Sequence, residues 1–399
     1  MNRIITLISR HLPVFLAIVA FNYSSAQCIL PNPTANNANI TCGQSVTLTA
    51  SGGTNYNWYS NAAGSQLLGT GATYITPVLS NTTTYYVQSV SGVANNTLQF
   101  TNCGATGETG PTLAQMNAAY AGTPLSGLVT SNTQGIQEWT VPSTGTYTIT
   151  AAGAKGGDAN NAIGGSGRSI TITTSLTQGH VIKILVGQQG GNLNFATGWA
   201  GGGGGGTFLF NQTTNQLILA AGGGGGAGKG DPNQYNFTLN GGDASAYNNT
   251  SGGTGINCPQ SWCSAGGGGT NGAGGQAGGY PSNQGGAAGS GWNSQGTTGT
   301  YGGGIGQTFN QGGLGGVNQT ACGTWNTSSN GGFGGGGGAG MCTNYEALGG
   351  GGGGYSGGGG AGCRVGAGGG GGSFESSSPN GTTGGSGGGG GTRGDASGV

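Results

Sequence analysis

The sequence predicts an all-β protein in which a small β-sandwich precedes a larger sandwich or jelly roll and a glycine-rich segment. Residues 28–91 contain short runs rich in Thr, Tyr and Val that are separated by Gly and Asn. Residues 136–221 contain three pairs of alternating apolar runs, each pair joined by a short polar turn. Beyond Ala221 glycine dominates, and the whole sequence holds 102 glycines among 399 residues. Alternation with period two and frequent turn residues are typical of strands rather than helices.

The first 26 residues have the pattern of a secretory signal peptide. Arg3 and Arg10 precede the apolar run 12–21, and the small residues 24–26 follow it. We expect cleavage after Ala26. The apolar run is too short to cross a bilayer as a retained anchor, which is the alternative interpretation, and no later stretch is long enough either. The sequence therefore predicts a secreted or cell-surface protein without a transmembrane segment after cleavage.

Residues 27–92 predict a small β-sandwich. Val46, Leu48 and Ala50 alternate with polar residues, and Trp58 lies in the middle of the next apolar run. Short strands around a central Trp are typical of immunoglobulin-like sandwiches, and the stretch resembles the immunoglobulin-like modules repeated in bacterial surface proteins. The two widely spaced cysteines of antibody domains are absent. Cys28 and Cys42 could instead form a local bridge.

Residues 98–221 predict the core of the second sandwich, preceded by one short helix. Thr112 can cap this helix with Gln115 reaching back to it, while Leu113, Met116 and Tyr120 share one face. After the helix, we expect three successive hairpins, each with one apolar face. Their turns are expected at residues 143–145, 177–179 and 212–215.

Residues 222–399 form the glycine-rich part, for which order and disorder are both open. Ordering a glycine costs roughly 0.5–1 kcal/mol more than ordering an alanine, so composition alone favours a disordered tract. Aromatic residues and four cysteines interrupt the tract, which favours order. A polyglycine chain can form an extended left-handed helix with three residues per turn. Without side chains such helices can approach until their backbones hydrogen-bond, so we predict a bundle of polyglycine helices.

Several sequence blocks resemble the glycine-rich extracellular domain of the anaplastic lymphoma kinase and leukocyte tyrosine kinase receptors. These blocks include "GIQEWTVPSTGTYTITAAGAKGG", "WAGGGGGGTFLF" and "LILAAGGGGGA", and together they span residues 98–372. The resemblance implies a tumour-necrosis-factor-like sandwich with an inserted bundle of polyglycine helices that binds protein ligands. The kinase and the membrane span of the receptors have no counterpart here. The chain also stops before the terminal strand expected to complete the sandwich, so this part of the domain is either truncated or rebuilt.

Eight cysteines in a secreted chain predict disulfides. The resemblance implies that Cys322 pairs with Cys342. Cys258 and Cys263 would close a small local loop. In the receptors the block around Cys103 carries a second cysteine, where this chain has Met116. We therefore expect either a disulfide between Cys103 and Cys363 or two reduced cysteines.

The sequence contains no convincing catalytic, cofactor or metal site. Charged residues make up only 4% of the chain, which argues against nucleic-acid binding. Gly223, Gly228 and Lys229 have the spacing of a phosphate loop, but Gly230 stands where Ser or Thr would hold magnesium, which excludes a nucleotide site. A hydrolase would need His180 as its base, although an exposed turn residue is the simpler interpretation. With one histidine after the signal peptide and no C-x-x-C pair, we expect no metal.

The sequence therefore predicts a non-enzymatic binding or adhesion protein, whose partner is a protein or a glycan. A purely structural spacer of a surface layer or matrix is one alternative. The other is the ligand-binding extracellular part related to a receptor tyrosine kinase, without the kinase motifs H-R-D and D-F-G. Tryptophans such as Trp262 and Trp292 could stack on sugars, with packing in the glycine-rich part as the competing interpretation.

Overall fold

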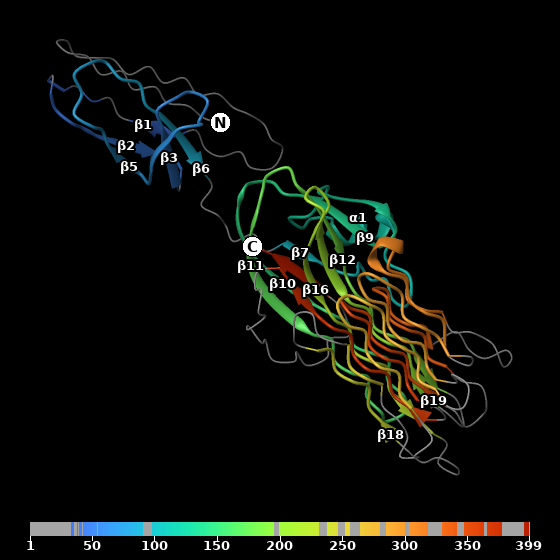
Figure 1. Cartoon of the computed structure of the whole chain (residues 1–399). Coiled ribbons are helices and arrows are strands. Elements are labelled where there is room, and N and C mark those ends of the chain that lie inside the picture. The colour runs from blue at the N-terminus through green and yellow to red at the C-terminus, as the bar shows by residue number, and fades with distance from the viewer. Residues whose placement is uncertain are drawn as a thin grey trace. The chain divides into compact units, whose positions relative to one another are not determined.

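The computed structural model divides the chain into two compact units, Met1–Asn96 and Thr97–Val399 (Figure 1). The described residues are 33–35, 38, 40–41, 43–53, 55–90, 98–194, 199–230, 238–245, 252–255, 264–279, 285–299, 303–317, 329–340, 347–362, 365–376 and 395–398. The predicted signal peptide lies outside these residues.

The first unit is the small β-sandwich that the sequence predicts. Its strands are β1 (Thr34–Ala35), β2 (Thr47–Ser51), β3 (Asn55–Tyr59), β4 (Leu67–Thr70), β5 (Thr73–Ile75) and β6 (Tyr86–Val90). They form two three-stranded sheets, β1-β2-β5 and β4-β3-β6, which share one apolar core. Trp58 is 1% exposed in that core, and its indole N–H donates to the carbonyl of Gly71 over 3.0 Å. The alternation in β2 buries Leu48 and Ala50, as predicted.

The second unit is built on a larger sandwich of two sheets. The first sheet has the order β11-β10-β22-β7, and the second has the order β21-β16-β15-β12-β9-β8. The strands of the first sheet are β7 (Leu98–Phe100), β10 (Gly145–Ala152), β11 (Ser169–Leu176) and β22 (Asp395–Gly398). Those of the second are β8 (Val129–Thr133), β9 (Ile136–Thr140), β12 (Val181–Leu185), β15 (Thr207–Asn211), β16 (Gln216–Ala221) and β21 (Phe374–Glu375). Apolar side chains of both sheets, such as Ile149 and Ile184, meet in one buried core.

Two of the three predicted hairpins are wrong. β9 pairs with β8 and β12, whereas β10 pairs with β11 and β22, so the turn at 143–145 crosses from one sheet to the other. The connection at 177–179 crosses in the same way from β11 to β12. β9 and β10 thus form one long bent strand, and β11 and β12 form a second. The two bent strands pair antiparallel with each other, in one sheet through β10–β11 and in the other through β9–β12. The third hairpin, β15–β16, is correct and contains a bulge between Leu209 and Phe210.

The terminal strand that the sequence analysis expected to be missing is present. β22 lies between β10 and β7, with Ala396 opposite Ala151 on one side and Phe100 on the other. The expectation failed because residues 395–398 carry little apolar signal of their own. Their pairing is set by the two neighbouring strands rather than by a local pattern.

The predicted helix is α1 (Leu113–Tyr120), and its capping box is formed as expected. Thr112 Oγ1 accepts from the amide of Gln115 over 3.3 Å, and the Gln115 side chain accepts from the amide of Thr112 over 2.8 Å. Met116 and Tyr120, which lie one turn apart, are buried. Leu113 is 41% exposed, so its predicted place on the buried face is wrong. The packing contact begins only one turn into the helix.

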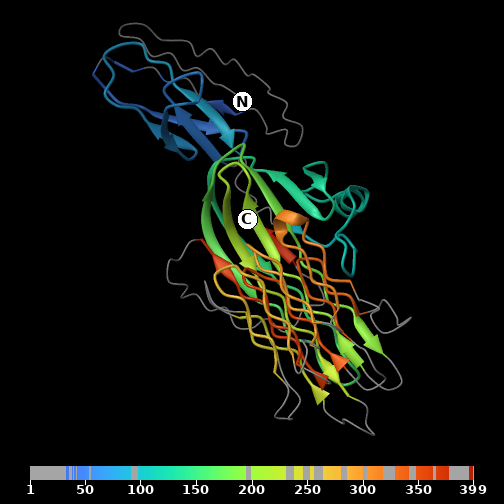
Figure 2. The same cartoon turned by 45° about the vertical axis from the view of Figure 1, so that its right-hand side comes forward.

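Glycine segments form an ordered bundle, as the sequence predicts. In the run 201–206, every third amide donates to the same neighbouring segment. Gly201 and Gly204 donate to residues 227 and 224, Gly202 and Gly205 to residues 191 and 188, and Gly203 and Gly206 to residues 337 and 334. A backbone that repeats its direction every three residues is the left-handed extended helix of polyglycine. Figures 1 and 2 show these segments side by side, extending away from the sandwich.

The run 349–354 repeats this pattern with three other segments, to which its amides donate in turn. The acceptors lie in segments 366–369, 201–204 and 287–290. A Cβ added at Gly203 would collide with the carbonyl oxygen of Gly351, so the spacing of the bundle requires bare backbone. Segments that precede residue 222, such as 187–191 and 201–206, also belong to the bundle. Short ladders lie within it: β13 (Asn192–Asn194), β14 (Trp199–Gly201), β17 (Gly228–Lys229), β18 (Thr238–Leu239), β19 (Ala347–Leu348) and β20 (Val365–Gly366).

Candidate binding groove

His180, which the sequence analysis considered as a catalytic base, and the buried Glu138 both make side-chain contacts within the sandwich. His180 follows β11, and its Nδ1 lies 3.1 Å from the side-chain nitrogen of Asn211. Glu138 accepts a hydrogen bond from Asn132 over 2.7 Å and lies 3.5 Å from Lys183. Among the described residues, no three His, Cys, Asp or Glu side chains come together as a metal site would require.

The stretch that resembles a phosphate loop is part of the glycine bundle. A phosphate cradle needs free backbone amides. Here the four consecutive amides of residues 223–226 donate to carbonyls of residues 353, 154, 242 and 350. Gly228 and Lys229 form β17, and the Lys229 ammonium donates to Thr238 Oγ1 over 2.7 Å. These contacts occupy the amides of residues 223–226 that a phosphate cradle would need.

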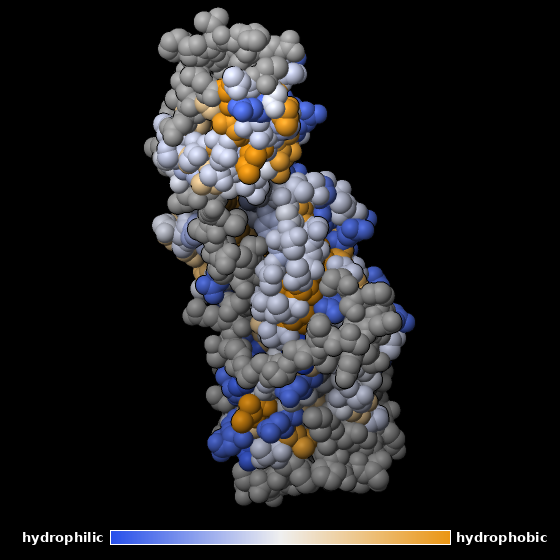
Figure 3. All heavy atoms as spheres, turned by 90° about the vertical axis from the view of Figure 1, so that its left-hand side faces the viewer, coloured by the Kyte–Doolittle hydropathy of each residue, from blue (hydrophilic) through white to orange (hydrophobic). Residues whose placement is uncertain are grey.

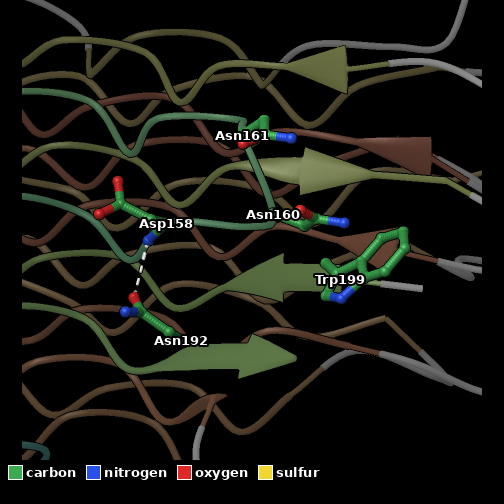
Figure 4. A pocket seen from close by; sticks show the side chains of 5 residues that line it. All are labelled: Asp158, Asn160, Asn161, Asn192 and Trp199. Carbon is green, nitrogen blue, oxygen red and sulfur yellow. Dashed lines mark hydrogen bonds between the residues drawn. The ribbon is translucent and has the colours of Figure 1, made fainter. Parts of the chain in front are cut away.

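One surface hollow lies near the short sheet β13-β14-β17-β18 and has a volume of about 490 Å³. We call it the Trp199 hollow. It is lined by Asp158, Asn160, Asn161, Asn192 and Trp199 (Figure 4). Asn160 and Asn161 form the tip of a tight turn with φ of 23° and 67°, a conformation that Asn tolerates better than most residues.

The polar groups of the Trp199 hollow are largely used to hold this turn. The Asp158 carboxylate accepts from Lys155 over 2.6 and 2.8 Å and from the amide of Gly164 over 2.8 Å. The amide of Asp158 donates to Asn192 over 2.8 Å, as the dashed line in Figure 4 shows. One aromatic ring and an already neutralised carboxylate give this hollow little to offer a ligand.

A larger groove, with a volume of about 740 Å³, lies where one side of the sandwich meets the glycine bundle. We call it the Trp292 groove. Strands β11, β16 and β21 contribute to its lining, and two glycine-rich segments supply further side chains. Its lining residues are Thr174, Ser175, Leu176, Asn211, Asn215, Gln216, Leu217, Ile218, Trp292, Asn293, Tyr355, Phe374, Glu375 and Ser376.

Three half-buried aromatic rings line this groove. Tyr355 and Phe374 are stacked with ring centres 4.8 Å apart, and Trp292 packs 5.6 Å from Phe210 and 5.2 Å from Phe309. Backbone hydrogen bonds join the segments that carry them. The amide of Trp292 donates to the carbonyl of Tyr355, and the amide of Tyr355 donates to the carbonyl of residue 372, both over 2.8 Å. The glycine bundle thereby fixes the positions of the rings before any ligand arrives.

The polar lining of the Trp292 groove is almost without charge. Glu375 is the one charged side chain among the described lining residues, and it is 7% exposed. Gln216 and Asn293 are exposed amides at the surface, and Asn293 also donates to the carbonyl of Asn271 over 3.0 Å.

Figure 3 shows one face of the molecule, on which orange and blue atoms of the described residues form small separate patches among pale ones.

Of the residues that line this groove, the sequence marked only Trp292 as a candidate for binding. The lining comes from segments up to about 200 positions apart, and no local motif marks them. Tyr355 and Phe374 each lie beside a glycine run, so an aromatic residue next to such a run is the one signal that could have pointed to them. Trp262 lies outside the described residues.

Of the eight cysteines, the described residues include Cys103, which carries a free thiol. Its Sγ lies 3.5 Å from the carbonyl oxygen of Thr101, and burial raises the pKa of the thiol. The predicted pairs Cys322–Cys342, Cys258–Cys263 and Cys28–Cys42 lie outside the described residues. So does Cys363, while Cys103 is reduced in the structure, which is one of the two states expected for it.

Two comparisons relate parts of this chain to known proteins. Residues 31–106 match the family model of the Ig-like domain described as CHU_C associated, which covers the described strands of the first unit together with β7. A stretch of 95 residues is 40% identical to the leukocyte tyrosine kinase receptor of Mus musculus. That match covers 23% of this chain and 11% of the receptor, so the shared segment is about a tenth of the receptor's length. Both resemblances stated from the sequence are confirmed at this level.

No helix among the described residues combines the length and the apolar character needed to cross a bilayer.

Proposed function

We propose that this protein is a secreted or cell-surface binding protein without enzymatic activity, which recognises a protein or glycan ligand through the Trp292 groove. The observation that carries this proposal is the fixed row of half-buried aromatic rings beside neutral amide side chains. Such a mixture of apolar rings and a few convergent polar groups is typical of ligand sites. Similarity to a receptor and to an Ig-like domain supports a location outside the cell.

The arrangement favours adhesion by shape and hydrogen bonding rather than by charge. Glu375 is largely buried, so little charge is available at the groove to steer a partner. A ligand would gain affinity because the half-buried rings lose little freedom on binding. The glycine bundle supplies this preorganisation, which gives it a role beyond spacing.

A purely structural spacer is the second candidate, because a hydrogen-bonded bundle would also stiffen a surface layer. The two functions differ in a binding experiment with the mature chain, residues 27–399. An adhesion protein should bind cell-surface preparations saturably, and excess unlabelled chain should compete. A spacer should show no saturable binding and should self-associate in sedimentation measurements.

The groove itself is tested by the variant Trp292→Ala, with Trp199→Ala as the matched control. Both variants remove a half-buried tryptophan from the same unit, and only the first changes the groove. We expect Trp292→Ala to weaken surface binding at least tenfold and Trp199→Ala to leave it unchanged. Equal binding by both variants and the parent chain would show that the groove is not the site.

A further inference from the structure

We propose that the Trp292 groove binds a neutral oligosaccharide, an inference that rests on the proposed function and names its ligand class. Three properties of the groove support this inference, namely its partly exposed aromatic rings, its hydrogen-bonding groups and its low charge. Each property separates a saccharide from the other ligands that an adhesion protein could bind.

The aromatic rings offer the kind of surface on which a sugar ring packs. One face of a hexose carries mainly C–H groups and is apolar, while its rim carries hydroxyls. Trp and Tyr rings match this mixture because they combine a large apolar face with a polar end. Trp292, Tyr355 and Phe374 are all half-buried, so each ring keeps part of its surface at the groove. Several such rings in one open groove suit a chain of sugars.

The polar lining residues match hydroxyl groups in their hydrogen bonding. A sugar hydroxyl both donates and accepts, and Asn, Gln, Ser and Thr side chains do the same. Five exposed side chains of the groove lining carry amide or hydroxyl groups of this kind. They are Ser175, Asn215, Gln216, Asn293 and Ser376.

The charge of the groove argues for a neutral glycan rather than an acidic one. No Lys, Arg or His is among the described lining residues, so a sialic acid or a sulfate would find no cation there. The cavity volume of about 740 Å³ lies within the ~300–1,000 Å³ usual for small-molecule sites.

A peptide ligand would meet two sheet edges at the groove, those of β21 and β11. An extended peptide commonly binds by adding a strand to an exposed sheet edge. β21, the edge strand of the six-stranded sheet at this groove, is only two residues long. It offers too short a ladder for strand addition to supply much affinity. β11, the eight-residue edge strand of the other sheet, also lines the groove, so a peptide paired with β11 is the competing ligand that the periodate experiment below distinguishes.

The experiment uses the mature chain and a panel of neutral tetrasaccharides of glucose, galactose, mannose and N-acetylglucosamine, in α- and β-linked forms. We expect at least one of them to bind in calorimetry and to shift tryptophan fluorescence. Trp292→Ala and Tyr355→Ala should weaken that binding at least tenfold, whereas the control Trp199→Ala should not. Because Trp292 also packs inside the unit, the variants Gln216→Ala and Asn293→Ala, which change exposed side chains, test the groove without removing a packed ring. Together they should weaken binding several-fold.

Three outcomes would overturn the inference. If no tetrasaccharide binds while the chain still binds cell surfaces after periodate oxidation of their glycans, the ligand is a protein and the proposed function stands. If neither tetrasaccharides nor surfaces bind, both proposals fail. If a tetrasaccharide binds but none of the four groove variants changes its affinity, the saccharide site lies elsewhere.

Discussion

At many positions of the bundle, neighbouring backbone leaves no space for a side chain, so only glycine fits. At Gly203 a side chain is ruled out by the carbonyl of Gly351, although the backbone angles there are ordinary. At Gly267, by contrast, no atom lies within 4 Å of the place that a Cβ would take. The same residue type is therefore essential at one position of the bundle and replaceable at another.

This contrast gives a matched pair of substitutions. Gly203→Ala should destabilise the second unit by about 1–3 kcal/mol, because the added methyl must push two backbones apart. Gly267→Ala should be neutral or stabilising by about 0.4–1 kcal/mol, since alanine restricts the unfolded chain. Chemical denaturation of the two variants checks this, and equal losses of stability would refute close packing at Gly203.

Tyr120 connects the helix to the sandwich through its buried hydroxyl. The hydroxyl donates to Gln137 over 2.5 Å and accepts from the amide of Thr101 over 2.9 Å. Burial, and secondarily the contact with Cys103, raises the pKa of this phenol above its usual value of 10.0. The folded state therefore favours the protonated form, and its contribution to stability is complete below about pH 10.

Above about pH 10 this contribution should be lost, because the unfolded phenol ionises while the folded one stays protonated. Tyr120→Phe should lower the free energy of unfolding by about 1–3 kcal/mol near neutral pH. It should also lose less stability than the parent between about pH 9 and pH 11. Denaturation curves over that range measure both effects, and parallel pH profiles would contradict the assignment.

At the scale of elements, the sequence predicted what depends on local signals. The capping box of α1 and the β15–β16 hairpin need only residues that are close in sequence. The turns at 143–145 and 177–179 look equally local, yet they cross between sheets. Turn residues mark where a strand ends, and the partner of the next strand depends on distant segments. For the same reason the Trp292 groove was visible only as one isolated tryptophan.

Strand β22 is the element whose place is set most completely by its neighbours. It fills the gap between β10 and β7, which do not pair directly. Deleting residues 395–399 should leave two unpaired strand edges and lower Tm by about 5 °C or more. A chain that lacks Val399 alone serves as the control, and calorimetric scans compare the two. Unchanged melting after the longer deletion would mean that β22 does not hold the sheet together.

At the scale of the whole second unit, the glycine bundle acts as a core without side chains. Sandwich strands bury apolar residues in the usual way, and the bundle replaces that burial with backbone hydrogen bonds in three directions. The cost of ordering so many glycines is offset only if these bonds form together. Rigidity of the bundle is also what holds Trp292 and Tyr355 at the groove, so the proposed binding function depends on it.

Amide hydrogen exchange of the mature chain, followed by mass spectrometry, tests this structure most directly. Amides in the runs 201–206, 222–227 and 349–354 donate to neighbouring segments and should exchange orders of magnitude more slowly than amides of an unstructured glycine peptide. Slow exchange in all three runs would support a cooperative polyglycine bundle. Exchange at random-coil rates there, with protection confined to the sandwich strands, would contradict it.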